Sequence, residues 1–194
     1  DEARAAERPL FDAAVPLMRR AAAALADVVR AELATGETVT TLTGVLEPVI
    51  RESPIALRPR VLVLAGSGDN GGDALYAAAH LARVADIDVL LVSERFHEAA
   101  LATAVAAGVR RLDLPEVDDG LRHYALVVDG IVGIGASADS ALRGRARGVV
   151  TAIRDDLQRG GRMPRLIAVD IPTGLHPDTG AADDAVLAAS VTLT

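Results

Sequence analysis

Short, uninterrupted apolar segments that alternate with Ala-rich segments limit the folds open to this chain. An apolar run without polar alternation is typical of a strand that is buried on both faces, as in a parallel sheet covered by helices. The alternation therefore predicts an α/β fold, a three-layer α/β/α Rossmann-like sandwich with a mostly parallel central sheet, in one domain over residues 1–194. The predicted strands are 61–65, 87–92, 109–114, 124–128, 166–169 and 190–194, and the helices between them are 74–84, 96–107 and 149–158.

A long helix is predicted before the first strand. Apolar residues recur at spacings of mostly three and four between residues 10 and 35, which predicts one buried helical face. Residues 35–60 then mix Thr, Gly, Glu and Pro and are interpreted as a long connection. The residues of the predicted face are Leu10, Ala14, Leu17, Ala21, Ala24, Leu25 and Val28.

The charge and composition exclude several classes of function. The net charge of -7 and the aromatic content of 2% disfavour nucleic acid as a partner. All 20 basic residues are Arg, so a Walker A lysine and Schiff-base catalysis are excluded, and the absence of Cys excludes disulfides and thiolate zinc sites. No apolar run reaches the length of a membrane helix, so we expect a cytoplasmic protein without a membrane partner.

A Gly-rich loop follows the first predicted strand. Gly66, Gly68 and Gly71 satisfy G-x-G-x-x-G, a pattern that can hold a pyrophosphate on backbone N–H groups at a helix N-terminus. Asn70 and Asp73 add an amide and a carboxylate, which favours a cation or hydroxyl group beside the phosphate. The alternative is structural: Asp69 or Asn70 caps the following helix and the glycines only make a turn.

Two further loops place carboxylates at strand ends. Asp129 ends the strand at 124–128 and is followed by a second Gly-rich loop, another possible phosphate site. Asp170 ends the strand at 166–169, where Pro172 and Gly174 predict a sharp turn that restrains it as a ligand or catalytic carboxylate. For both carboxylates the alternative interpretation is a turn cap.

The four His residues give little support for a metal centre. His80, His97 and His123 are interpreted as surface or packing residues, and only His176 lies near a candidate site. No pair has the spacing of zinc ligands, so zinc is not expected.

Together the three loops resemble one family, the YjeF amino-terminal domains, which are NAD(P)H-hydrate epimerases. The family patterns are approximately G-x-G-N-N-G-G-D-G, D-A-L-F-G-x-G and V-D-I-P-S-G, and here they stand as G-S-G-D-N-G-G-D-A, D-G-I-V-G-I-G and V-D-I-P-T-G. The segment Leu17 to Ala21 also resembles the family's L-M-x-R-A. The departures are Asp69 for Asn, Ala74 for Gly and Thr173 for Ser, and Arg95 alone stands where the family has a basic residue after the second strand.

The resemblance implies that the chain interconverts the R and S forms of hydrated NADH or NADPH at C6 of the nicotinamide ring. By the same resemblance Asn70, Asp129 and Thr173 hold a potassium ion, and oxygen ligands suit such a hard cation. Asp170 is implied as the catalytic group and as a contact of the hydrated ring. The other implied substrate contacts are Asp69, Asn70, Gly71, Gly72, Asp73, Gly133, Ile134, Gly135, Arg143 and Gly144.

The family also implies partners, and two other functions stay open. A homodimer is expected, together with a fused or separate ADP- or ATP-dependent NAD(P)H-hydrate dehydratase. One alternative is an NAD(P)-dependent Rossmann dehydrogenase, for which Glu94 is a possible ribose contact. The other is a YjeF-like scaffold that binds ligand without turnover.

Overall fold

The computed structural model describes residues 17–35, 58–113, 120–133, 142–159 and 163–194. Six strands form one sheet in the order β3-β2-β1-β4-β5-β6, and all five neighbouring pairs are parallel. This confirms the α/β fold class. The strands are β1 (Arg60–Ala65), β2 (Asp86–Leu91), β3 (Arg110–Leu112), β4 (Leu126–Gly130), β5 (Arg165–Val169) and β6 (Val191–Leu193).

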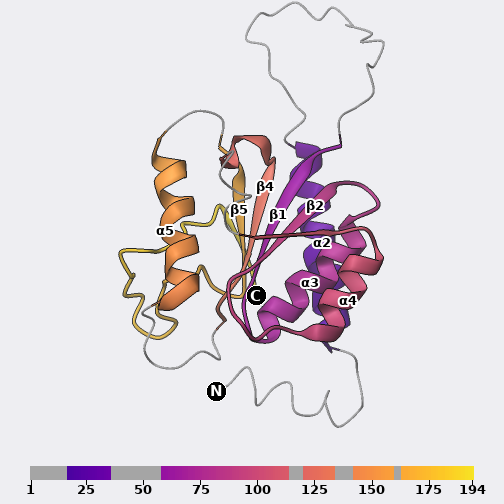
Figure 1. Ribbon diagram of the computed structural model, residues 1–194. Coiled ribbons are helices and arrows are strands. Elements are labelled where there is room, and N and C mark those ends of the chain that lie inside the picture. The colour runs from indigo at the N-terminus through magenta and orange to yellow at the C-terminus, as the bar shows by residue number, and fades with distance from the viewer. Residues whose placement is uncertain (1–16, 36–57, 114–119, 134–141, 160–162) are drawn as a thin grey trace, which may run out of the picture.

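Helices cover both faces of the sheet (Figure 1). Three of them lie together on one face and α5 lies on the other, so the sheet is the middle of three layers. None of the helices in the described ranges is both long and apolar enough to cross a lipid bilayer. The helices are α2 (Leu17–Thr35), α3 (Asp69–Leu81), α4 (Glu98–Ala106), η2 (Leu121–His123) and α5 (Gly144–Gln158).

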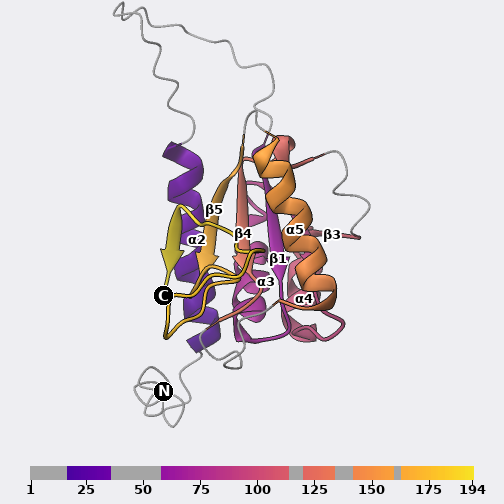
Figure 2. The ribbon, with the colours of Figure 1, turned by 90° about the vertical axis from the view of Figure 1, so that its left-hand side faces the viewer.

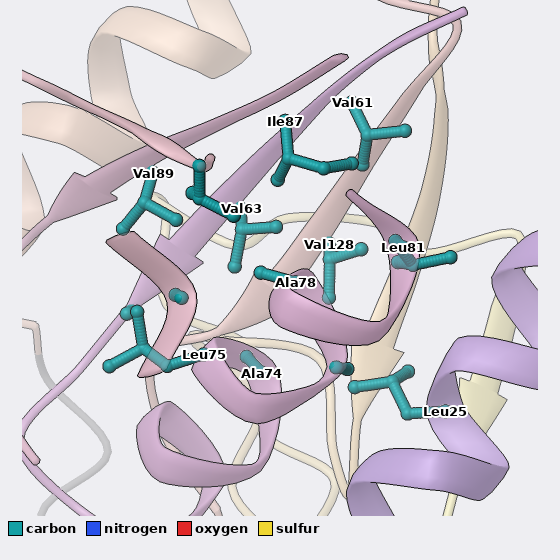
Figure 3. Packing of buried hydrophobic residues seen from close by; sticks show 14 of the residues in the cluster. Leu25, Val61, Val63, Ala74, Leu75, Ala78, Leu81, Ile87, Val89 and Val128 are labelled. Atoms are coloured by element: carbon teal, nitrogen blue, oxygen red, sulfur yellow. The ribbon is translucent and has the colours of Figure 1, made fainter. Parts of the chain in front are cut away.

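Two apolar clusters fill the spaces on either side of the sheet. Figure 3 shows the larger one, in which Leu75 and Leu81 of α3 and Leu25 of α2 lie over the valines of the central strands. The smaller cluster joins α5 to the opposite face through residues such as Val149 and Ile153. With both faces covered, β1, β2, β4 and β5 are buried along almost their whole length, as their apolar sequences predict.

The first helix is found where it was expected, but its buried face is different. Of the predicted face within the described residues, Leu25 is fully buried and Leu17 and Val28 are half-buried, whereas Ala21 and Ala24 are exposed. The residues actually buried are Ala22, Leu25, Ala26 and Val29. The residues predicted before Leu17, and most of the expected connection at 35–60, lie outside the described ranges.

The second helix begins earlier than predicted. α3 starts at Asp69 rather than at residue 74, so Asn70 and the two following glycines form its first turn instead of a loop before it. The carboxyl ends of the parallel strands lie at one edge of the sheet, the lower edge in Figure 2, and α3 starts there. This edge is where ligands bind in open α/β sheets.

Candidate functional site

Close backbone approach holds the first loop against the end of β4. Gly66 donates from its N–H to the carbonyl of Gly130 at 3.0 Å, and a Cβ on Gly66 would lie 1.9 Å from the Ile131 carbonyl oxygen. Gly71 packs closely on Gly66, since a Cβ on Gly71 would lie 2.2 Å from the Gly66 carbonyl oxygen. Gly68 faces open space. Two of the three glycines of G-x-G-x-x-G are therefore required by packing alone.

The Asn70 side chain joins all three predicted loops. Its Nδ2 donates to the carbonyl of Val169 at the end of β5 at 3.0 Å, and to the carbonyl of Val132 after β4 at 3.3 Å. Gly133 packs directly on this amide, because a Cβ there would lie 2.5 Å from Nδ2. With both amide hydrogens directed at carbonyls, the Asn70 oxygen is left as an acceptor or a ligand.

Asp129 is a fully buried carboxylate at the centre of this edge. It lies within β4, between Leu64 of β1 and Ala168 of β5 in the register of the sheet, and it has 0% exposure. Its Oδ2 accepts a hydrogen bond from the Thr173 N–H at 2.8 Å, and its Oδ1 accepts one from the Thr173 hydroxyl at 2.6 Å. The Ile131 N–H also donates to Oδ1, at 3.3 Å.

Burial raises the pKa of the Asp129 carboxyl, and the hydrogen bonds from Thr173 and Ile131 only partly oppose this effect. In the described part of the chain, no arginine forms an ion pair with Asp129. A buried carboxylate that has only neutral donors is stabilised by a bound cation. The Thr173 hydroxyl donates its hydrogen to Asp129, so its lone pairs are available to such an ion.

Asp170 has a backbone conformation that suits a restrained functional group. Its φ is 71°, in the left-handed region that few residues other than Gly, Asn and Asp adopt. The Asp170 N–H donates to the Leu193 carbonyl of β6 at 2.6 Å, and the Ile171 N–H donates back to Val169 at 2.9 Å. The residue is half-buried at the edge of the sheet. Such strain persists only where the surroundings impose it, and it is found most often at functional sites.

The remaining predicted residues divide between the two sides of the sheet. Asp69 is exposed at the start of α3, and the three residues after Asn70 continue that first turn. Arg143 is the N-cap residue of α5 on the opposite side, and Gly144 begins that helix with a φ of 55°. Ile134 and Gly135 lie outside the described residues.

Two histidines make structural contacts, as the sequence suggested for His97. The Nδ1 of His97 accepts from the Ala100 N–H at 3.1 Å and caps α4, and its ring packs on Tyr76. It also touches the first turn of α3, because a Cβ on Gly72 would lie 3.1 Å from its Cδ2. His176 accepts from the backbone N–H groups of two following residues and so closes its own turn.

A concavity of about 540 Å³ lies at the opposite edge of the sheet, near the amino ends of β1 and β2. Its charged groups satisfy one another: Asp88 accepts from Arg60 at 2.6 Å and from Arg110 at 2.8 Å. Arg58 donates to the carbonyls of Ala82 and Ala85 after the end of α3. We therefore assign this region to the structure of the sheet. The sequence interpretation missed this cluster because Asp88 lies inside an otherwise apolar segment.

Comparisons with known proteins agree with the geometry. The family described as YjeF-related protein N-terminus matches residues 14–194. An NAD(P)H-hydrate epimerase of Microbacterium testaceum is 48% identical over 195 residues, which cover 100% of this chain and 66% of that protein. The corresponding epimerase of Clavibacter michiganensis subsp. michiganensis is 46% identical, covering 98% of this chain and 76% of the relative.

More distant relatives extend the comparison. The bifunctional NAD(P)H-hydrate repair enzyme Nnr of Mycobacterium tuberculosis is 38% identical over 100% of this chain, which spans only 36% of that enzyme. Among solved structures, yeast ynu0 matches with a TM-score of 0.67 at 23% identity, over 91% of this chain and 68% of its own. This structure supports the fold alone. The match over residues 14–194 and the two bacterial relatives place the chain in the family of YjeF-related N-terminal domains.

Proposed function

We propose that this chain is an isomerase that interconverts the R and S forms of hydrated NADH or NADPH, as part of nicotinamide-cofactor repair. The observation that carries the proposal is the Asn70 amide, which bonds to Val132 and Val169 and so brings three loops to one edge of the sheet. Relatives of 48% and 46% identity are named NAD(P)H-hydrate epimerases, which supports the same activity here.

Epimerisation requires a proton-transfer group but no redox partner. Epimerisation leaves the atoms and electrons of the substrate unchanged, so it needs no redox partner. It needs a group that takes up and returns a proton beside the reacting carbon, and a carboxylate can do both. Asp170 is the candidate, because its backbone is restrained and its side chain is half-buried at the edge where the ring is expected.

We further propose that Asn70, Asp129 and Thr173 hold a potassium ion. All three offer oxygen atoms, and Asp129 is buried without an arginine partner among the described residues, so the site fits a hard monovalent cation. When bound, the ion supplies positive charge beside the dinucleotide. Asn70 holds the three loops together, and the hydrogen bonds from Thr173 orient the Asp129 carboxylate.

The dinucleotide would lie across the carboxyl edge of the sheet. Its phosphates would meet the residues from Asp69 to Asp73 at the start of α3, together with Gly133 after β4 and Arg143 and Gly144 at the start of α5. N-terminal turns of helices offer unpaired backbone N–H groups to phosphate oxygens. A homodimer, a cytoplasmic location and a single domain over the whole chain stay predictions from the sequence. A dehydratase, fused or separate, is supported by the bifunctional mycobacterial relative.

Separated S and R hydrates of NADPH provide the test. We expect each epimer to convert to the same equilibrium mixture when the purified chain is added, as measured by chromatography. Binding of the hydrate without conversion would favour the scaffold alternative. Oxidation of an alcohol with a change in nicotinamide absorbance, in place of conversion, would favour the dehydrogenase alternative.

A further inference from the structure

Asp183, between β5 and β6, has a side chain that is only 7% exposed and connects three segments of the chain. Its Oδ1 accepts from the Ala185 N–H at 2.8 Å and from Nη1 of Arg147 on α5 at 2.9 Å. Its Oδ2 accepts from the same Nη1 at 3.1 Å and from the Leu142 N–H at 3.3 Å. Leu142 directly precedes Arg143, the N-cap residue of α5. One carboxylate therefore holds both the first turn of α5, through Arg147, and the backbone two residues before that helix, through Leu142.

The segment that carries Asp183 is itself bonded to the candidate site. The Asp183 N–H donates to the Gly174 carbonyl at 2.7 Å, and the Leu187 N–H donates to the Thr173 carbonyl at 3.0 Å. Gly174 has a φ of 90°, and a Cβ there would lie 2.8 Å from the Cα of Val186. This packing leaves little room for Thr173 and Asp183 to move independently of each other.

The side chain of the neighbouring Asp184 meets that of Asp183, but it accepts no hydrogen bond from the Leu142 or Ala185 backbone. Its carboxylate meets Nη2 of Arg147 at 2.6 Å, but its side chain is 81% exposed. Exposed ion pairs contribute little to stability and hold their partners loosely. Two adjacent aspartates thus share one arginine, and among the described residues only Asp183 accepts a hydrogen bond from the Leu142 backbone.

We propose that Asp183 is a positioning residue, which holds the segment Leu142 to Gly144 at the start of α5 in register with Thr173. This inference rests on the proposed function, in which Arg143 and Gly144 meet the dinucleotide phosphates. The loop of Asp170 and Thr173 meets the nicotinamide end of the ligand. A substrate bound at two points requires a fixed separation between them, so a shift of one binding segment relative to the other weakens binding of the substrate. Asp183 does not itself touch the substrate.

Asp183→Asn separates this role from simple packing, because it preserves the shape of the side chain. Asn has one carbonyl oxygen, which accepts, and one NH2 group, which donates. At one of the two former carboxylate oxygen positions, a donor therefore faces another donor N–H. The rotamer that keeps the shorter bonds to Ala185 and Arg147 sets the amide nitrogen against the Leu142 N–H. The hydrogen bond from the Leu142 N–H is therefore the first to be lost. Asp184→Asn is the matched control, since it removes a charge from the same arginine.

The experiment combines steady-state epimerisation of NADPH hydrate with hydrogen exchange at the Leu142 amide. For Asp183→Asn we expect KM to rise about tenfold with kcat changed less than about threefold, the pattern of lost binding rather than lost chemistry. Exchange at Leu142 should become about tenfold faster as its hydrogen bond is lost. For Asp184→Asn, KM, kcat and the exchange rate should stay within about twofold of the parent values.

Each result of these measurements either supports or overturns the positioning role of Asp183. Equal effects of the two substitutions, or an unchanged KM and Leu142 exchange in Asp183→Asn, would overturn the proposal. If Asp183→Asn does not fold, exchange in the parent protein decides: a protected Leu142 amide supports the contact, and exchange at the rate of an unstructured amide overturns it. If the parent protein does not epimerise the hydrate, the proposed function fails, whereas Leu142 exchange and the Kd for NADPH still test the positioning role.

Discussion

Asp129 and Thr173 are joined by two hydrogen bonds although 44 residues separate them in the sequence. The threonine donates both its N–H and its hydroxyl hydrogen, so its backbone and its side chain both approach the same carboxylate. Both residues have 0% exposure. The pair therefore fixes the loop after β5 on the end of β4, and the proposed cation site depends on it.

Replacing Thr173 by Val tests this pair. Valine keeps the shape of the side chain but removes the hydroxyl, which leaves Asp129 with fewer donors in a buried site. We expect the free energy of unfolding to fall by about 1–3 kcal/mol, the cost of a lost hydrogen bond to a buried charged group. We also expect potassium to raise the Tm of the parent protein more than sodium does, and this difference to vanish in Thr173→Val. Thermal unfolding in each salt measures both effects.

The control is Thr173→Ser, which restores the residue expected from the family pattern and keeps the hydroxyl. Its stability and its response to potassium should stay close to those of the parent protein. A full potassium response in Thr173→Val would show that the hydroxyl is not a ligand.

The first loop offers a test with two glycines of one motif. Gly66→Ala should destabilise the protein severely, since the new Cβ would lie 1.9 Å from a backbone oxygen of Ile131 that cannot move aside cheaply. Gly68→Ala should cost no more than about 1 kcal/mol, because no atom lies within 4 Å of its Cβ and its φ of -94° suits alanine, so only the preference for Gly over Ala at the N-cap of α3 opposes it. Urea unfolding of the two variants measures the difference. Similar stabilities for both would contradict the close approach.

The strands and the site loops were predictable because each depends on a local pattern. Buried parallel strands carry unbroken apolar runs, and the residues after them fall at one edge of the sheet whatever the details of the fold. This is why Asn70, Asp129 and Asp170 could be selected before their contacts were known, whereas Thr173 was selected only through the resemblance to the YjeF amino-terminal domains. The distances between these side chains could not be predicted from the sequence, because they depend on tertiary packing such as that of Gly133 on the Asn70 amide.

The failures of prediction have physical causes. The first helix is so rich in Ala that several faces are equally apolar, so spacing could not select the face at Ala22 and Val29 over that at Ala21 and Ala24. The start of α3 at Asp69 was missed because glycines disfavour helix, and here tertiary packing overrides that preference. The contacts of Asp183 come from residues 36 and 41 positions away, which no local pattern records.

Asp88 should determine part of the stability of the sheet at acid pH. Burial opposes its ionisation, but hydrogen bonds from Arg110, Arg60 and Tyr124 outweigh burial and lower the pKa of the carboxyl. The stabilisation is therefore fully present above the unfolded pKa of about 3.9 and is lost as the pH falls through the lower folded value. We expect Asp88→Asn to cost about 2 kcal/mol at pH 7, and the difference from the parent to shrink below about pH 4.

Denaturant unfolding across pH 2–7, with Asp86→Asn as the control, measures this effect. Asp86 lies in the same strand, but its side chain is 60% exposed and lies 3.6 Å from its Arg58 partner. Its replacement should change stability by less than about 0.5 kcal/mol. A constant difference between Asp88→Asn and the parent at all pH values would contradict the charge-based account.

In the proposed function, Asp170 is restrained at the edge where the three loops meet and moves the proton in epimerisation. The most direct test is the rate at which isolated S-NADPH hydrate reaches equilibrium with the parent protein and with Asp170→Asn. Asparagine tolerates the φ of 71° as aspartate does, so the variant should fold with an unchanged Tm and should still bind the hydrate. We predict a rate lower by about 100- to 10,000-fold, the usual contribution of general acid–base catalysis. A folded variant that equilibrates the epimers at the parent rate would contradict the claim.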